Sequence, residues 1–314
     1  MTQLAMRAIE PQTDWPRMAE IMRLSFGGNP EDFRANLTDP AVLDATIGFT
    51  VDGELAALAA GFDHQLVLAD SSQHAAKFGS GLMLHPDHRG KGLGGHAIEL
   101  LIQRFAAQGA KYLVIEGGVQ GLYQRAGFDI VGYVPQWQAP LAALTSTSKP
   151  SAQVRKVTDQ EAASQFPQIE LDAGGFQPGR MLRGDQMWWY TFNGSNQPTD
   201  SFVIEDDDGK PIGHFTLAMG SSGGNQDREK RRVTLRNWWT NSDQGRLAML
   251  AYLKRFESWF DGIAWVGGMP CPLSRHFDVW PQLVSLRPIM VRPLGETTLS
   301  GDEFVGGWFN ELCP

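Results

Sequence analysis

The stretch from residue 85 to 95, His-Pro-Asp-His-Arg-Gly-Lys-Gly-Leu-Gly-Gly, constrains the fold more than any other part of the sequence. The apolar run 78–84 before it predicts a strand, and apolar residues spaced by three or four from Leu93 to Phe105 predict a helix after it. A glycine turn at a helix N-terminus leaves backbone N–H groups unpaired beside a partial positive charge. Glycines also let a pyrophosphate approach those groups closely. The stretch therefore predicts an anion-binding loop.

The glycine spacing of this loop distinguishes between nucleotide-binding patterns. The order of glycines and lysine in this loop differs from Gly-x-x-x-x-Gly-Lys-[Ser/Thr], the pattern of an ATP-type phosphate loop. The dinucleotide fingerprint Gly-x-Gly-x-x-Gly is formally satisfied by Gly90, Gly92 and Gly95. That fingerprint also needs an acidic residue about 20 positions later to bind the ribose. Glu116 lies near that position but ends the next strand, where it has another possible role, so the match is poor. The run 89–94, Arg-Gly-Lys-Gly-Leu-Gly, instead resembles the Arg/Gln-x-x-Gly-x-Gly/Ala loop of the GNAT acyltransferases, which holds the pyrophosphate of acetyl-CoA. The alternative is a glycine turn that only joins a strand to a helix.

A second motif supports the resemblance. The apolar run 112–116 predicts a short strand, and residues 121–128 then read Gly-Leu-Tyr-Gln-Arg-Ala-Gly-Phe. GNAT enzymes carry a Leu-Tyr-x-x-x-Gly-Phe segment after their fifth strand, with the tyrosine near the CoA sulfur. The matching residues lie about thirty positions after the loop, as in the family. Two linked motifs at this separation are more specific than either alone.

Composition excludes several classes of protein. Hydrophobic residues make up 42% and charged residues 20%, which is typical of a soluble globular protein. The formal charge of −8 argues against a general nucleic-acid or membrane-surface role. We expect no transmembrane span and no signal sequence. Cys271 and Cys313 form neither a disulfide framework nor a metal-spaced pair, so we expect a cytoplasmic protein without a metal.

The predicted order of elements fits the same resemblance. Helical spacing at 15–26, a short helix at 30–37 and a hairpin at 46–61 around Asp52-Gly53 precede a further strand at 65–68. With the strands and helices around the two motifs, this order resembles a GNAT domain. That fold is α/β (α+β), with a mixed, mostly antiparallel sheet flanked by helices. We expect a catalytic domain at 1–138.

The second half of the chain predicts a related unit without the loop. An Ala/Ser/Thr/Pro-rich linker is expected at 139–152, and a second domain at 153–314 repeats the order hairpin, strand, helix, strand. Its loop at 241–246 has one glycine, and Asp243 would repel a phosphate. We therefore expect two GNAT-like units in tandem, the second degenerate. Eight of the ten tryptophans follow residue 152; a bulky core is expected, and a substrate-lining role is the alternative.

The tandem pattern is similar to the enhanced intracellular survival family of aminoglycoside and protein lysine acetyltransferases. Residues 246–254 and 289–294 resemble the degenerate central unit of that family. Family members continue into a sterol-carrier-like third domain, whereas this sequence stops at Pro314, so we expect that domain to be absent. Mycothiol synthase, another tandem GNAT protein of similar length, is a further relative.

The resemblance implies roles for named residues. Strand residues Leu82, Met83 and Leu84 would offer backbone groups to the pantetheine arm. Tyr123 would protonate the leaving thiolate, and Glu116 is a candidate general base that a water could replace. We expect His85 and His88 to have turn or surface roles. The residues implied in holding the pyrophosphate are Arg89, Gly90, Lys91, Gly92, Leu93, Gly94 and Gly95.

Two functions remain open at this point. The first is an acetyl-CoA-dependent N-acetyltransferase. Its acceptor would be a primary amine of a small molecule, such as an aminoglycoside-like compound, or of a lysine side chain. The second is a non-catalytic acyl-CoA-binding or sensing protein. Tyr123 favours the enzyme, because a binding protein has no need of a hydroxyl at the sulfur. Homo-oligomers are compatible with either function.

Overall fold

The computed structural model describes residues 4–27, 29–145, 150–172, 181–193, 199–219, 232–240, 242–267, 271 and 273–297. The chain forms two compact units built from non-contiguous segments. Unit 1 comprises Met1–Gly132, Met181–Asn196 and Pro288–Val305, and unit 2 comprises Tyr133–Arg180, Gln197–Arg287 and Gly306–Pro314. This division differs from the expected domains at 1–138 and 153–314.

Unit 1 is a mixed sheet with strand order β1-β2-β3-β4-β5-β13. Neighbouring strands are antiparallel except β4 and β5, which are parallel. The sixth position is filled by the last part of β13, with Ile289 opposite Glu116 and Pro293 opposite Tyr112. The strands are β1 (Leu4–Arg7), β2 (Thr46–Val51), β3 (Glu54–Val67), β4 (Gln73–Leu84), β5 (Tyr112–Glu116) and β13 (Gln282–Pro293).

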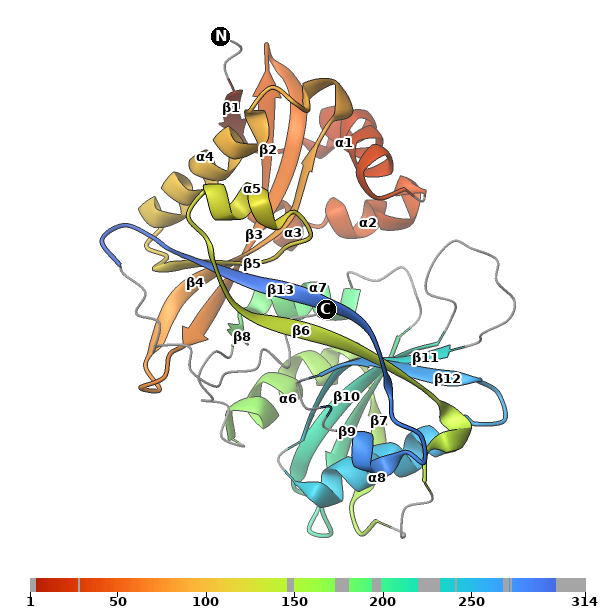
Figure 1. Ribbon diagram of the computed structural model, residues 1–314. Coiled ribbons are helices and arrows are strands. Elements are labelled where there is room, and N and C mark those ends of the chain that lie inside the picture. The colour runs from red at the N-terminus through yellow and green to blue at the C-terminus, as the bar shows by residue number, and fades with distance from the viewer. Residues whose placement is uncertain are drawn as a thin grey trace. The chain divides into compact units, whose positions relative to one another are not determined.

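Helices cover both faces of this sheet (Figure 1). On one face α4 buries Leu93, Ala97 and Leu101 against the sheet, as their spacing predicts. On the other face α1 buries Trp15, Met18 and Ile21. The helices of unit 1 are α1 (Pro11–Phe26), η1 (Pro30–Phe33), α2 (Arg34–Leu37), α3 (Pro40–Ala45), η2 (Pro86–His88), α4 (Leu93–Ala107), α5 (Gln120–Arg125) and α7 (Asp185–Asn193).

One expectation about unit 1 was wrong. No separate strand occupies 65–68, because β3 continues to Val67 and pairs with β4 as far as that residue. Lys77 and Asp63 form an ion pair of 2.8 Å across the two strands. The segment expected within the second domain also supplies β8 (Met181–Arg183) to the edge of β3. Trp188 of α7 is buried in unit 1, with the Arg183 guanidinium 4.7 Å from its ring.

Unit 2 has a sheet with the order β7-β9-β10-β11-β12-β6. As in unit 1, one neighbouring pair, β11 and β12, is parallel and the others are antiparallel. The strands are β6 (Asp129–Pro140), β7 (Gln153–Val157), β9 (Thr199–Glu205), β10 (Pro211–Met219), β11 (Arg232–Thr240) and β12 (Gly262–Val266). The helices are η3 (Leu141–Ala143), α6 (Asp159–Asp172), α8 (Asp243–Lys254) and η4 (Ser274–His276).

The sixth strand of each sheet comes from the other half of the sequence. β6 follows the Tyr123 segment, yet its residues Gln136 to Pro140 pair with β12 of unit 2. β13 follows unit 2, yet its last residues pair with β5 of unit 1. The expected linker at 139–152 is therefore partly structured, and Leu141 and Leu144 are buried in the unit 2 core.

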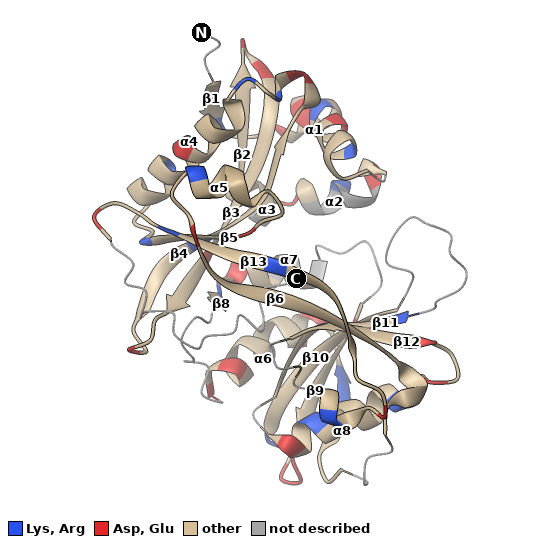
Figure 2. Cartoon of the chain, viewed as in Figure 1, with Lys and Arg blue, Asp and Glu red and all other residues tan. Residues whose placement is uncertain are grey.

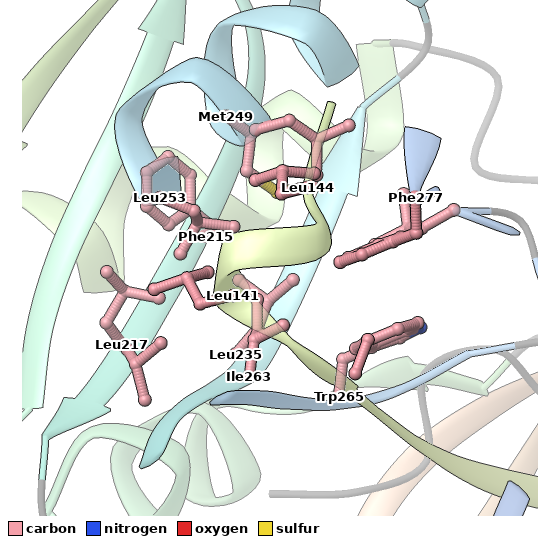
Figure 3. Close-up of a cluster of buried hydrophobic side chains, with 14 of the residues drawn as sticks. Leu141, Leu144, Phe215, Leu217, Leu235, Met249, Leu253, Ile263, Trp265 and Phe277 are labelled. Atoms are coloured by element: carbon pink, nitrogen blue, oxygen red, sulfur yellow. The ribbon is translucent and has the colours of Figure 1, made fainter. Parts of the chain in front are cut away.

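Aromatic and aliphatic side chains pack densely in the core of unit 2 (Figure 3). The rings of Trp265 and Phe277 stack with centroids 5.5 Å apart, and Phe215 stacks on Phe202 at 4.8 Å. Such pairs contribute about 0.5–1.5 kcal/mol beyond the area that they bury. Lys, Arg, Asp and Glu residues lie on helices, on loops and on several strands (Figure 2). No helix in the described ranges is long and apolar enough to span a membrane.

The buried His64 of β3 yields a prediction about acid stability. Burial lowers the pKa of His64 from 6.5 to about 4, and Arg183 and Lys77 add to this effect while Asp63 opposes it. Between pH 6.5 and about 4 the unfolded chain therefore takes up a proton that the native protein does not. The free energy of unfolding should fall with pH in this window, by up to about 1.4 kcal/mol per pH unit from this residue.

Denaturant titrations of wild type and His64→Gln across this pH window test the prediction. The difference in unfolding free energy between the two proteins should change with pH, because contributions from all other groups cancel. A difference that stays constant from pH 7 to pH 4 would contradict it.

Candidate active site

β4 parts from β5 halfway along its length. The parallel register runs from Ala76 opposite Tyr112 to Gly79 opposite Ile115 and extends no further in these two strands. Just beyond Gly79 the register of β4 with β3 shifts, which marks a bulge with one extra residue on β4. Gly81 lies in the bulge with φ of +61°, a conformation that favours glycine. Residues Leu82 to Leu84, which we expect to bind the pantetheine arm, thus begin within the bulge and pair with no residue of β5.

The loop after β4 presents open backbone at the start of α4. Gly90 and Gly92 have φ of +74° and +76°, and Gly92 is the N-cap of α4 without any side-chain cap. A Cβ placed at Gly90, Gly92 or Gly95 would have no atom within 4 Å. A Cβ at Gly94 would meet only Leu122, at ordinary contact distance. The space in front of the helix N-terminus is therefore available to a ligand, as an anion-binding loop requires.

The cations of this loop hold its shape in the described structure. Arg89 Nε donates to the carbonyl of Leu84 at 2.9 Å, and Lys91 Nζ donates to the carbonyl of Asp87 at 2.7 Å. Both side chains are exposed and adjoin the open glycines. They therefore lie where they can also complement the charge of a bound phosphate.

His85 is more deeply buried than the sequence indicated. It caps η2 by accepting from the N–H of Asp87, which is a turn role, but its side chain is only 5% exposed. Its Nε2 lies 3.3 Å from Arg17 Nη1 and 3.6 Å from Glu20 Oε1 of α1. The sequence missed this because α1 lies far from residue 85 along the chain.

Tyr123 lines a small cavity on the α4 side of the parted strands. The cavity, of about 20 Å³, is bounded by Ser80 and Leu82 of β4, Ile115 of β5 and Phe128, among others. The Tyr123 ring packs edge-on against Phe128 at 5.5 Å. Burial raises the pKa of the Tyr123 hydroxyl above its usual 10. The hydroxyl therefore keeps its proton at neutral pH.

Glu116 lies on the opposite face of the sheet from Tyr123. Leu113 and Ile115 of β5 pack in the α4 core, so alternation along the strand turns Glu116 to the other face. Glu116 ends β5 and pairs with Ile289. The two candidate catalytic groups thus flank the point where β4 and β5 part.

The corresponding loop of unit 2 is closed by its own side chains. Ser242 caps α8 by accepting from the N–H of Gly245 at 3.0 Å. The Asp243 carboxylate forms ion pairs with Arg246 and Arg275, and Arg275 in particular lowers the pKa of Asp243. A Cβ at Gly245 would lie 2.2 Å from the Thr240 hydroxyl. Asn241, predicted in the same loop, lies outside the described residues.

In unit 2 strands β11 and β12 also part, but the side chain of Trp238 forms a hydrogen bond from one strand to the other. β11 has a bulge after its parallel register with β12, which ends at Leu235 opposite Trp265. Beyond the bulge, Trp238 Nε1 donates to the carbonyl of Val266 at the end of β12, at 2.9 Å. Trp137 Nε1 donates to the next carbonyl, that of Gly267, at 3.2 Å. The adjacent tryptophans of the sequence predicted a role in the core. No sequence pattern indicated the Trp238 hydrogen bond or the ion pair between Arg275 and Asp243.

Comparison with known proteins supports this description. Residues 6–131 match the family model of the acetyltransferase (GNAT) domain. A search of curated protein sequences gives no match. The fold is similar to a GCN5-related N-acetyltransferase from Anabaena variabilis, with TM-score 0.79 and 16% identity over 93% of this chain and 73% of that one.

Two further solved structures share the fold. Eis1 from Mycobacterium abscessus aligns with TM-score 0.65 and 14% identity, over 93% of this chain and 73% of that one. N-myristoyltransferase from Saccharomyces cerevisiae with bound myristoyl-CoA aligns with TM-score 0.64 and 14% identity, over 96% of this chain and 82% of that one. The fold class expected from the sequence is thus confirmed, and the similarity to the acetyltransferase (GNAT) domain covers residues 6–131.

Gly94→Val tests whether the loop binds CoA. A Cβ at Gly94 has room in the free protein and no left-handed backbone to strain, and the branched side chain of valine would project beside the open N–H groups. We expect the melting temperature to stay close to wild type while CoA affinity measured by calorimetry falls at least tenfold. Wild-type affinity in this folded variant would place the cofactor elsewhere.

Proposed function

We propose that unit 1 is an acyl-CoA-dependent N-acyltransferase that transfers an acetyl group to a primary amine. The proposal depends on two features that unit 1 combines. Strand β4 parts from β5, and the start of α4 that directly follows β4 is lined by glycines and has no side-chain cap. Each feature exposes backbone hydrogen-bonding groups that need a partner. A pyrophosphate joined to a pantetheine arm would satisfy both.

Named residues of unit 1 would hold acetyl-CoA. Backbone N–H groups of residues 90–95 would bind the pyrophosphate, with Arg89 and Lys91 adding positive charge. Backbone groups of Leu82, Met83 and Leu84 would bind the pantetheine arm along β4. Acetyl-CoA supplies the activated thioester, and this chemistry requires no metal.

Tyr123 and Glu116 would divide the proton transfers between the two faces of the sheet. The Tyr123 hydroxyl, which burial keeps protonated, would donate its proton to the departing CoA sulfur. The Glu116 carboxylate would accept the proton of the attacking amine, directly or through water. Acid and base on opposite faces would suit an acyl-CoA and an amine that approach the gap between β4 and β5 from opposite sides.

The acceptor would be a primary amine of a small molecule, such as an aminoglycoside, or of a lysine side chain. The net charge of −8 is compatible with a polycationic acceptor. Because acyl-CoA is an intracellular metabolite, this function would place the protein in the cytoplasm.

The alternative function is an acyl-CoA sensor that binds acyl-CoA without catalysing a reaction. Thiol release from acetyl-CoA with amines, aminoglycosides and lysine peptides separates the two, since a sensor binds CoA but releases no thiol.

Tyr123→Phe should retain CoA affinity and lose turnover by about 10²–10⁴-fold, because the lost hydroxyl acts only on the leaving sulfur. The alkaline fall in wild-type turnover should lie above pH 10, since burial raises the pKa of Tyr123, and should be absent from the residual activity of the variant. Steady-state kinetics with thiol detection measures both effects.

Tyr133→Phe is the matched control, because Tyr133 does not line the Tyr123 cavity, and it should leave turnover unchanged. Equal turnover in Tyr123→Phe and wild type would remove Tyr123 from the mechanism.

We further propose that unit 2 is a degenerate GNAT-like copy, so that each chain binds one CoA. Its strand order repeats that of unit 1, but Asp243 with its two arginines takes the place of a phosphate, and Trp238 spans the parted strands. Calorimetric titration with CoA should give a stoichiometry near one per chain, and Gly94→Val should weaken that single site at least tenfold. A stoichiometry near two, with one site surviving Gly94→Val, would show that unit 2 also binds CoA.

A further inference from the structure

The cavity beside Tyr123 is small and almost entirely apolar. Its volume of about 20 Å³ has room for about one water-sized group, which is also the size of a methyl group. Apart from Ser80 and Tyr123, the residues that the described structure places around it have apolar side chains or are glycine. Such a cavity suits a short hydrocarbon group, because a polar group would find few hydrogen-bond partners there.

The cavity lies at the point where β4 and β5 stop pairing. Gly79 and Ile115, the last residue pair of the parallel register, both line it, and so does Leu82 in the bulge. The glycine loop follows directly after Leu84. A pantetheine arm that starts at a pyrophosphate in the loop and runs back along β4 therefore brings its sulfur end to the bulge, beside the cavity.

Tyr123 and Phe105 border the cavity from opposite sides of β4. The Tyr123 ring lies beside the end of β5, since a Cβ at Gly117 would be 3.3 Å from two of its ring atoms. The Phe105 ring of α4 lies over β3, since a Cβ at Gly61 would be only 2.1 Å from its Cζ. β4 separates β3 from β5 in the sheet. A chain that enters the cavity beside Tyr123 and extends across β4 therefore meets Phe105.

The Phe105 ring is held in place by its neighbours. Its side chain is 2% exposed, and its tip rests on the β3 backbone at Gly61. The Lys77 ammonium lies 5.6 Å from the ring centroid, which is a cation–π distance. Lys77 is fixed in turn by its ion pair with Asp63. Because protein cores are closely packed, a ring held in this way does not move aside readily to admit a larger group.

We propose that this cavity holds the alkyl end of the acyl group and that Phe105 limits the acyl chain to the length of an acetyl group. The inference rests on the proposed acyltransfer, which brings the CoA sulfur to Tyr123. The acyl carbonyl carbon is bonded to that sulfur, and the acetyl methyl attached to this carbon fits the cavity. Each further carbon of a longer acyl chain would have to displace the Phe105 ring. Phe105 is therefore a specificity-determining residue.

The acyl selectivity of Phe105→Leu tests the proposal. In wild type, kcat/KM with butyryl-CoA should be at least about tenfold lower than with acetyl-CoA, since one misfitting methylene costs about 10–200-fold. Leucine lacks the ring tip that rests on Gly61, so this preference for acetyl-CoA should shrink at least about tenfold in the variant. Phe49→Leu is the matched control, because Phe49 is buried in the same core but does not line the cavity, and it should keep the wild-type preference.

Calorimetry with acyl-CoA in the absence of an amine provides a second measurement that needs no turnover. Wild type should bind acetyl-CoA more tightly than butyryl-CoA. Ala59 lines the cavity and faces the α4 core, so Ala59→Val fills the space of the acetyl methyl. This variant should bind CoA as wild type does and acetyl-CoA about fourfold more weakly than wild type, the effect of one methyl group left unburied. Circular dichroism confirms that each variant is folded, and Ala59→Val decides the matter if Phe105→Leu is not.

The outcomes separate this inference from the proposed function. Equal kcat/KM for butyryl-CoA and acetyl-CoA in wild type, equal changes in Phe105→Leu and Phe49→Leu, or wild-type acetyl-CoA affinity in Ala59→Val would each overturn the acyl pocket and leave the acyltransferase in place. Absence of thiol release with every amine would instead overturn the proposed function. The calorimetric difference between acetyl-CoA and butyryl-CoA would then still decide whether the cavity holds the acyl group.

Discussion

The parting of β4 from β5 governs the rest of unit 1. Four parallel residue pairs hold the two strands together, and the bulge at Gly81 then turns β4 away. Backbone groups inside a protein need partners, so strands that part must leave those groups to a ligand, water or a side chain. Other elements are arranged around this opening: α4 begins at its end, Tyr123 lines one side, and β13 pairs with the far edge of β5.

Unit 2 meets the same constraint in a different way. Its strands part after a bulge at the equivalent place, but indole N–H groups of Trp238 and Trp137 satisfy the carbonyls at the end of β12. Its helix start is capped by Ser242, and its carboxylate Asp243 pairs with two arginines. At the place where unit 1 leaves backbone open, unit 2 supplies internal partners for the carbonyls of Val266 and Gly267, the N–H of Gly245 and the Asp243 carboxylate. This difference supports assigning ligand binding to unit 1.

The sequence predicted the parts of this arrangement that depend on local pattern. The strand at 112–116, the helix from Leu93 and the hairpin around Asp52 formed as expected, because periodicity and turn residues specify them locally. The glycine loop formed with the open geometry that its spacing implied.

Long-range features could not be predicted in this way. The exchange of β6 and β13 between sheets is invisible to periodicity, which identifies a strand but not its neighbour. For the same reason the sequence missed the burial of His85 against α1, the place of Trp188 in unit 1 and the Arg275 ion pair with Asp243. The roles of Glu116 as base and Tyr123 as acid remain predictions. They are supported by the family resemblance and by the positions of the two residues on opposite faces of the sheet.

Hydrogen exchange measured with and without CoA tests the central claim most directly, because it reports on the backbone N–H groups themselves. The account predicts that CoA slows exchange in two segments of unit 1, residues 82–84 of β4 and 90–95 of the loop. It predicts no change at residues 236–240 and 242–246, the corresponding segments of unit 2. Protection at 242–246, or unchanged exchange at 90–95 under saturating CoA, would contradict the account.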